Sequence, residues 1–190
     1  MAHDSIQGQR YLITFRLGQE TYALPVESIM RIVPMVTITP LPDAQHGDPV
    51  AGVINVRGQA VPVVDLRRHV GLEQALYLLH TPIILAQIGQ GTVGLVVDEV
   101  LDVLGLASSE LIPPDKILPE GLGRAPVLDA LVLVSGHIAP LLDPEHLFGP
   151  EQQKVLAQVI DSLRVPHAKR TDADGSSTEP SQDAKAEAKS

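Results

Sequence analysis

The chain has 190 residues, of which 44% are hydrophobic but only 3% are aromatic, and it contains neither Trp nor Cys. Its core must therefore be built from Val, Leu and Ile, which favours strands, and a disulfide or a thiolate metal site is excluded. The net charge of −9 argues against a nucleic-acid backbone as the principal partner. Neither an apolar run of roughly 20 residues, as membrane insertion requires, nor a signal peptide is recognisable, so we expect a cytoplasmic protein.

Short strands separated by Gly and Pro are predicted from residue 10 onward, after a flexible segment at residues 1–9. They fall into a first group at 11–17, 21–26, 53–56 and 60–66 and a second group at 82–88, 92–97, 131–134 and 137–142. Tight glycine-containing links within these groups are typical of antiparallel hairpins. Several short strands joined in this way predict a barrel or a sandwich.

An amphipathic helix is predicted over residues 150–164, with Pro150 at the first helical position. Val155, Val159 and Leu163 recur every four residues, which indicates one apolar face docked on the body of the protein. From residue 166 onward the sequence consists mainly of Ser, Asp, Lys, Ala and Glu. Such a segment buries too little apolar surface to offset the entropy of ordering, so we expect a disordered tail at 166–190.

The two groups of strands resemble each other. Residues 17–33 align with residues 88–104 without a gap, with Gly, Gln, Thr, Leu and Val in the same places. Residues 58–65 (Gly-Gln-Ala-Val-Pro-Val-Val-Asp) align with residues 136–143 (Gly-His-Ile-Ala-Pro-Leu-Leu-Asp). Two matching blocks in the same order predict a duplicated unit, although chance similarity between two generic hairpins is the competing explanation.

The repeat units, at about 10–71 and 82–149, are small for a β fold. Closing each sheet into a barrel would remove exposed strand edges. Packing the two barrels against each other would add buried area. A seam between them is then expected, and such seams often bind partners.

Comparison of the two copies singles out Arg57. Copy one reads Asn-Val-Arg-Gly at 55–58, where copy two reads Leu-Val-Ser-Gly at 133–136. The shared fold thus needs the Gly and the Val but neither the Asn nor the Arg. A permanently charged guanidinium suits a carboxylate or carbonyl groups of a partner. The alternative is an ordinary surface arginine paired with a nearby acid such as Asp65.

No catalytic residues and no metal ligands are predicted. Asp65 and Asp143 end equivalent strands, where a carboxylate usually accepts backbone N–H bonds of a turn. Acid–base catalysis needs two carboxylates in a cleft with separated pKa values, and no motif indicates such a pair. The seven histidines are scattered without metal-ligand spacing. We expect no cofactor, and an enzyme of unknown class using Asp65 or Asp98 is the alternative with least support.

The stretch from Gly52 to Arg67, Gly-Val-Ile-Asn-Val-Arg-Gly-Gln-Ala-Val-Pro-Val-Val-Asp-Leu-Arg, resembles the signature of the CheW-like chemotaxis coupling proteins. That signature has the pattern N-[LV]-R-G-x-x-x-P-[VIL]-[VIL]-D-[LM]-R. Residues 94–103 are similar to the family's second block, and residues 11–26 also fit. The resemblance implies one CheW-like domain over residues 10–165, mainly β, with two tandem five-stranded SH3-like barrels around a hydrophobic seam and a C-terminal helix.

The resemblance also implies a function. A member of this family would be a non-enzymatic adaptor that links the cytoplasmic tip of methyl-accepting chemoreceptors to the regulatory domain of a CheA-type histidine kinase. It would be cytoplasmic, recruited to membrane receptor arrays, and would bind no nucleic acid. An adaptor of the same fold in twitching motility or another chemosensory-like pathway is the alternative.

Two partner-facing regions follow from the same match. The receptor-binding side would comprise Arg57, Asn55, Ile29 and Arg31. The kinase-facing loop would run from Ile38 through Leu41 to Gly52. Ile29 would offer an apolar contact near the seam, in a groove that takes the apolar stripe of a receptor helix. Arg31 stands where some members carry an acidic residue, so its charge would alter the preference for a receptor.

Overall fold

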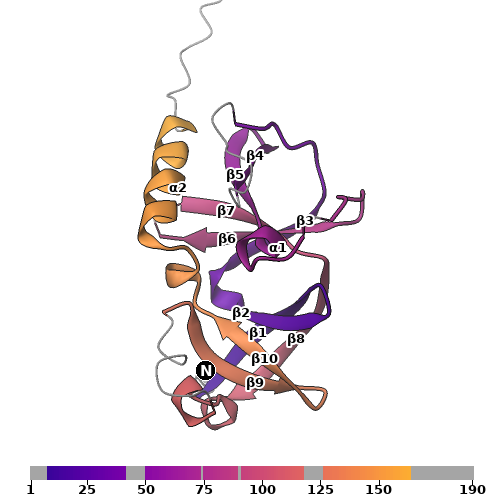
Figure 1. Cartoon of the computed structure of the whole chain (residues 1–190), viewed down its shortest axis with the longest axis vertical. Coiled ribbons are helices and arrows are strands. Elements are labelled where there is room, and N and C mark those ends of the chain that lie inside the picture. Colours follow the sequence, from indigo (N-terminus) through magenta and orange to yellow (C-terminus); the bar gives the residue numbers. More distant parts are fainter. Residues whose placement is uncertain (1–7, 42–49, 74, 90, 118–125, 164–190) are drawn as a thin grey trace, which may run out of the picture.

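The structure, a computed structural model (Figure 1), describes residues 8–41, 50–73, 75–89, 91–117 and 126–163. Two five-stranded sheets lie one above the other in Figure 1, and a long helix runs beside the upper one. The prediction of a mainly β fold with two five-stranded units and a C-terminal helix is confirmed. The predicted tail and nearly all of the predicted flexible N-terminus lie outside the described residues.

The lower sheet in Figure 1, called sheet A, has the strand order β8-β1-β2-β10-β9. Its strands are β1 (Gln9–Leu17), β2 (Glu20–Pro25), β8 (Glu99–Ala107), β9 (Leu128–Val134) and β10 (His137–Leu142). The hairpins β1–β2 and β9–β10 are antiparallel, whereas β2 and β10 run parallel, with Ala23 opposite Leu141.

The upper sheet, called sheet B, has the order β3-β6-β7-β5-β4. Its strands are β3 (Ile29–Pro34), β4 (Val50–Val56), β5 (Gln59–Asp65), β6 (Pro82–Ile88) and β7 (Gly91–Val96). The helices are α1 (Leu66–His69) and α2 (Pro150–Leu163), with short 3₁₀ turns η1 (Val26–Ser28), η2 (Ser108–Glu110), η3 (Pro114–Lys116) and η5 (Pro144–His146). All eight predicted strands are present, but β3 and β8 were not predicted.

The sheets do not follow the two repeats in order along the chain. Sheet A combines β1 and β2 with β8, β9 and β10, and sheet B combines β6 and β7 with β3, β4 and β5. Each sheet therefore takes two strands from one half and three from the other. The chain passes from sheet A to sheet B through η1, between β2 and β3, and returns at Val97 and Asp98, between β7 and β8.

The strand registers support the duplication. In sheet A the parallel pair joins Ala23 to Leu141, and in sheet B it joins Gly94 to Val63. Ala23 aligns with Gly94, and Leu141 with Val63, in the repeat alignment. The two sheets are thus the same structure made twice, with the last three strands of each copy exchanged.

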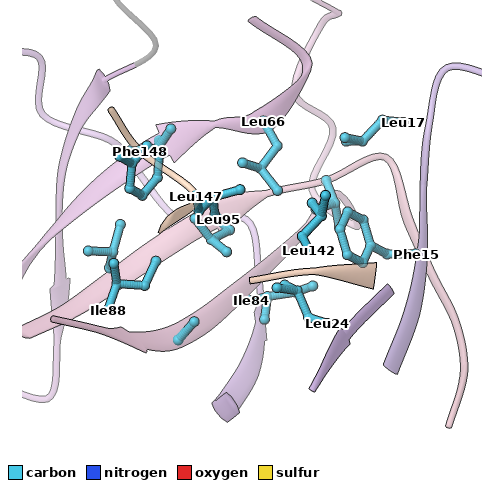
Figure 2. Close-up of a cluster of buried hydrophobic side chains, with 14 of the residues drawn as sticks. Phe15, Leu17, Leu24, Leu66, Ile84, Ile88, Leu95, Leu142, Leu147 and Phe148 are labelled. Atoms are coloured by element: carbon cyan, nitrogen blue, oxygen red, sulfur yellow. The ribbon is translucent and has the colours of Figure 1, made fainter. Parts of the chain in front are cut away.

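Three clusters of buried apolar side chains hold this arrangement together. One lies within each sheet, around Leu141 in sheet A and Val63 in sheet B. The largest, called the main cluster, joins the sheets and includes the labelled side chains of Figure 2: Phe15, Leu17, Leu24, Leu66, Ile84, Ile88, Leu95, Leu142, Leu147 and Phe148. The side chains at the seam between the sheets are buried, so the seam is part of the core. Each large buried side chain contributes about 1.5–3 kcal/mol to stability. In the part of the chain that the structure describes, no helix is long and apolar enough to cross a membrane.

Candidate partner-binding surfaces

The hairpin between β4 and β5 presents Arg57. Arg57 and Gly58 have φ angles of 54° and 87°, the two positive values of a type I′ turn. Asn55 Oδ1 accepts a hydrogen bond of 2.7 Å from the Gly58 N–H, so Asn55 stabilises this turn. The Arg57 side chain is exposed, and no hydrogen bond or ion pair joins it to any other described residue. Its guanidinium is free to bind an external acceptor.

The equivalent hairpin between β9 and β10 has the same turn but different chemistry. Ser135 and Gly136 have φ angles of 49° and 83°. Leu133 lies opposite Ile138 across the strands, and these side chains are 60% and 49% exposed. Asn55 and Ala60 take the corresponding places in the β4–β5 hairpin. The β9–β10 hairpin therefore presents an apolar pair, and the β4–β5 hairpin presents a cation that no described residue pairs with.

Asp65 is not the internal partner of Arg57 that the sequence left as an alternative. Asp65 is fully buried, and its two carboxylate oxygens accept hydrogen bonds from the Arg67 N–H at 2.9 Å and the Tyr77 hydroxyl at 2.7 Å. Asp143, its counterpart, accepts a bond of 2.9 Å from the Glu145 N–H. The predicted structural role of both carboxylates is confirmed.

The strand β3 carries the other two predicted receptor-binding residues. Ile29 is half-buried and packs against the main cluster. Arg31 is exposed, and its guanidinium has no hydrogen-bond or ion-pair partner within the described ranges. Because β3 and β4 are the first and last strands of sheet B, the sheet order does not place these residues next to Asn55 and Arg57.

Sequence reasoning missed two apolar neighbours on the same strand. Met30 and Ile32 are 62% and 41% exposed on either side of Arg31. Val103, which corresponds to Ile32 in the second copy, is 61% exposed on β8. The repeat alignment contained this signal, since apolar positions coincide over 29–33 and 100–104. Edge strands β3 and β8 thus each present apolar side chains beside charged ones.

Two of the three predicted kinase-facing residues, Ile38 and Gly52, lie at the outer edge of β4. Thr39 and Val53 exchange two backbone hydrogen bonds of 2.8 Å. Gly52, with a φ of 144°, permits this pairing, because a Cβ there would lie only 2.7 Å from Ile38 Cγ2 and closer still to the Thr39 carbonyl oxygen. The structure therefore brings Ile38 and Gly52 together. Leu41 packs instead against the main cluster, and the intervening residues 42–49 lie outside the described residues.

An open groove of about 410 Å³ adjoins this edge, and we call it the β4 groove. It is lined by Met35, Val36, Ile38, Pro40, Ala51, Arg68 and Tyr77. Arg68 is half-buried, and its guanidinium lacks a hydrogen-bond or ion-pair partner in the described part of the chain. An apolar groove with one unpaired cation suits a partner that presents apolar side chains and a carboxylate. Of the three predicted kinase-facing residues, Ile38 alone lines it.

The remaining titratable groups offer no catalytic arrangement among the described residues. The Asp98 carboxylate accepts bonds from the Gly18 N–H at 2.6 Å and from Arg67 Nη1 at 2.5 Å. Burial lowers the pKa of His69, opposed by a hydrogen bond with the backbone of Leu147. No group of three His, Cys, Asp or Glu side chains there could hold a metal ion.

Known proteins match this sequence and fold. The family model of the CheW-like domain matches residues 11–152. Chemotaxis protein CheW of Rhizobium meliloti is 29% identical over 147 residues, covering 77% of this chain and 92% of the relative. Chemotaxis protein CheW of Klebsiella aerogenes is 33% identical over 159 residues, covering 82% and 90%.

A solved structure of a CheW protein has a similar fold. The scaffolding protein TtCheW from Thermoanaerobacter tengcongensis superposes with a TM-score of 0.66 at 23% identity, covering 78% of this chain and 94% of that protein. Together with the family match, these relatives show that the chain belongs to the CheW-like family of chemotaxis scaffold proteins, which are adaptors rather than enzymes.

Proposed function

We propose that this adaptor couples methyl-accepting chemoreceptors to a CheA-type histidine kinase, in the cytoplasm beneath membrane receptor arrays. The observation that carries the proposal is the difference between two equivalent hairpins. One presents Arg57, whose side chain has no partner among the described residues, and the other presents the apolar pair Leu133 and Ile138. A duplicated fold in which only one of two equivalent turns carries a cation suits a protein that uses this turn to recognise a specific partner.

The receptor side contains Arg57, Asn55, Ile29 and Arg31. Arg57 is not required by its turn, because Ser135 makes the same turn in the second copy. A left-handed conformation is unfavourable for arginine by about 1 kcal/mol, and a charge-assisted bond to a receptor carboxylate would offset that. Asn55 fixes the turn that aims the guanidinium.

The strand β3, at the other end of the sheet order from β4, would form a second part of the receptor side. Arg31 lies between the exposed Met30 and Ile32, so the strand offers apolar contacts together with a second cation that no described residue pairs with. An amphipathic receptor helix fits such a surface if carboxylates flank its apolar stripe. Ile29, which packs against the main cluster, would act mainly by holding β3 in place.

The kinase side would be the β4 groove. Ile38 lines it directly, and Gly52 brings the segment of Ile38 against β4. Leu41 would anchor that segment to the main cluster. Arg68 supplies the groove's cation, so the regulatory domain of the kinase should contribute apolar side chains and at least one carboxylate.

A reconstitution tests both sides separately. Purified chain, receptor signalling fragment and kinase are mixed and scored for co-sedimentation and kinase stimulation. Arg57→Ala should weaken receptor binding by about 5- to 150-fold, the equivalent of about 1–3 kcal/mol for a lost charged hydrogen bond. The matched variant Ser135→Ala, at the same turn position of the other copy, should bind normally.

The kinase arm uses Ile38→Ser with the same readouts. This variant should lose affinity for the kinase while it keeps its affinity for the receptor fragment. Receptor binding that is unchanged in Arg57→Ala would overturn the assignment of the receptor side. Stimulation of a kinase from a twitching-motility system, but not of a chemotaxis kinase, would assign the adaptor to that other output.

A further inference from the structure

A second groove lies between α2 and the β6–β7 hairpin, and we call it the α2 groove. Figure 1 shows α2 beside these two strands. The groove has a volume of about 340 Å³, and its apolar lining includes Ile88, Val93, Leu156 and Ile160. A Cβ on Gly91 would lie 2.6 Å from Ile160 Cδ1. The helix therefore packs directly on the hairpin at one end and leaves the groove beside that contact.

The charged side chains that line the α2 groove are all negative. Glu145 and Asp161 are its charged lining residues, and no lysine or arginine lines it in the described part of the chain. Both carboxylates are exposed and form no ion pair with a described residue. Asp161 lies in the last turn of α2, where the helix dipole adds negative potential. An occupant should therefore be cationic with a small apolar part.

The segment that follows α2 directly in the sequence has this composition. Residues 164–170 read Arg-Val-Pro-His-Ala-Lys-Arg, with three cations and one valine. Only this segment of the tail has a net positive charge, because residues 171–190 contain five carboxylates and two lysines. We propose that residues 164–170 dock into the α2 groove, with their cations facing Glu145 and Asp161.

The lengths permit this docking. From Gln153 to Asp161 the helix rises about 12 Å, at about 1.5 Å per residue. Seven residues of extended chain span about 23 Å, enough to reverse direction after Leu163 and run back along the groove. Pro166 cannot continue the helix, which favours such a reversal. Because the segment is tethered beside its site, its effective concentration is in the range of about 1 mM, and weak contacts suffice.

This inference does not depend on the proposed receptor and kinase surfaces. It gives the α2 groove an intramolecular occupant that a basic and apolar peptide from another protein would have to displace. The α2 side of the adaptor would then be closed to weak ligands and open to stronger ones of the same chemistry.

A single spin label tests the docking in the full-length protein. The chain contains no Cys, so Thr171→Cys creates one site for a nitroxide. The label should broaden the amide signals of Ile88 and Val93. In Lys169→Glu/Arg170→Glu this broadening should fall by about threefold or more, as expected for the loss of two weak ion pairs. Lys185→Glu/Lys189→Glu, with the same change in net charge, should leave it unaltered.

A charge exchange completes the test. Combining Lys169→Glu/Arg170→Glu with Glu145→Lys/Asp161→Lys should restore the broadening. Equal broadening in the native and Lys169→Glu/Arg170→Glu proteins, or no broadening in either, would overturn the proposal. A decrease that the reversed groove fails to restore would also overturn it, because the segment would then be binding elsewhere.

Discussion

The guanidinium of Arg67 and the carboxylate of Asp98 lie 2.5 Å apart, at the point where the chain crosses between the two sheets. Arg67 follows β5 in sheet B, and Asp98 follows β7 and precedes β8 of sheet A. The same Asp98 oxygen accepts the Gly18 N–H of the β1–β2 turn at 2.6 Å. One carboxylate thus links a turn of sheet A to a helix that follows a strand of sheet B.

Removing this link should destabilise the whole fold. The two side chains are 21% and 26% exposed, so solvent screens them only in part. Arg67→Ala should lower the free energy of unfolding by about 1–3 kcal/mol, as measured by urea denaturation. Glu99→Gln is the control, because the Arg16–Glu99 pair is 46% and 56% exposed and should contribute less than about 0.5 kcal/mol. Equal effects of the two variants would contradict a linking role for Asp98.

Gly52 should tolerate no side chain. In Gly52→Ala the new Cβ would overlap the Thr39 carbonyl oxygen, so β4 and the segment of Ile38 would have to separate. We expect a loss of about 3 kcal/mol or more in thermal or urea unfolding. Gly58→Ala adds a Cβ in open space at a φ of 87° and should lose about 1 kcal/mol from backbone strain alone. A smaller loss in Gly52→Ala than in Gly58→Ala would show that the close approach does not exist.

Arg57→Asn should separate folding from binding. Asn is favoured at the first central position of a type I′ turn, and the replacement relieves the strain of arginine at a φ of 54°. The free energy of unfolding should therefore stay the same or rise by up to about 1 kcal/mol. Receptor affinity should nevertheless fall, since the guanidinium is gone. A variant that is less stable than the native protein would indicate an internal contact of Arg57.

His69 should make stability dependent on pH. Its Nδ1 atom is buried without a hydrogen-bond partner in the described structure, and its ring packs edge-on against Phe148. Burial lowers the pKa of His69 below its ordinary value of 6.5, so the unfolded chain binds this proton more readily than the folded one. The contribution of neutral His69 is complete above pH 6.5 and is lost as the pH falls towards the lower folded-state pKa.

The measurement is the melting temperature across pH 7.5 to 5. The native protein should lose stability on acidification, and His69→Phe should lose less over the same interval, because its ring cannot bind a proton. The test compares how stability changes with pH, and not the stability of the two proteins at one pH. His69→Phe also removes the hydrogen bond with Leu147, which changes stability at every pH. Identical pH profiles of the two proteins would contradict a buried neutral His69.

The hairpins were predictable from sequence because their signals are local. A glycine at the turn, such as Gly58 or Gly136, lies beside the strands that it joins. The strands β3 and β8 were missed because each pairs outside its own repeat, with β6 and β1. They also expose apolar side chains such as Met30 and Val103, so they lack the alternation that marks a half-buried strand.

The candidate site divides in the same way. Comparison of the repeats predicted that Arg57 is available for contact. The second copy makes the same turn without an arginine, so the alignment shows that the fold does not require one. The partners of Asp98 were not predictable, since the bond with Gly18 joins residues 80 positions apart. Arg68 and Tyr77 of the β4 groove were missed for the same reason: only the folded chain brings them to Ile38.

The exchange of strands between sheets leads to the last prediction. If each repeat formed its own barrel, the two halves of the chain would fold separately. Instead the N-terminal half holds β1 and β2 of sheet A but β3, β4 and β5 of sheet B. Separated from the other half, it would leave both sheets incomplete and expose the main cluster, whose members Phe15 and Leu95 come from different halves.

Cutting the chain after Leu76, whose side chain is 90% exposed, should therefore give two fragments that are each unfolded. Residues 1–76 and 77–190 alone should show no cooperative thermal transition by circular dichroism, because neither can bury its share of the core. Mixed in equal amounts, they should associate and recover the native spectrum, with a melting temperature that rises with concentration. Cooperative folding of either fragment alone would mean that one repeat can complete a sheet from its own strands, and the exchanged arrangement would then be wrong.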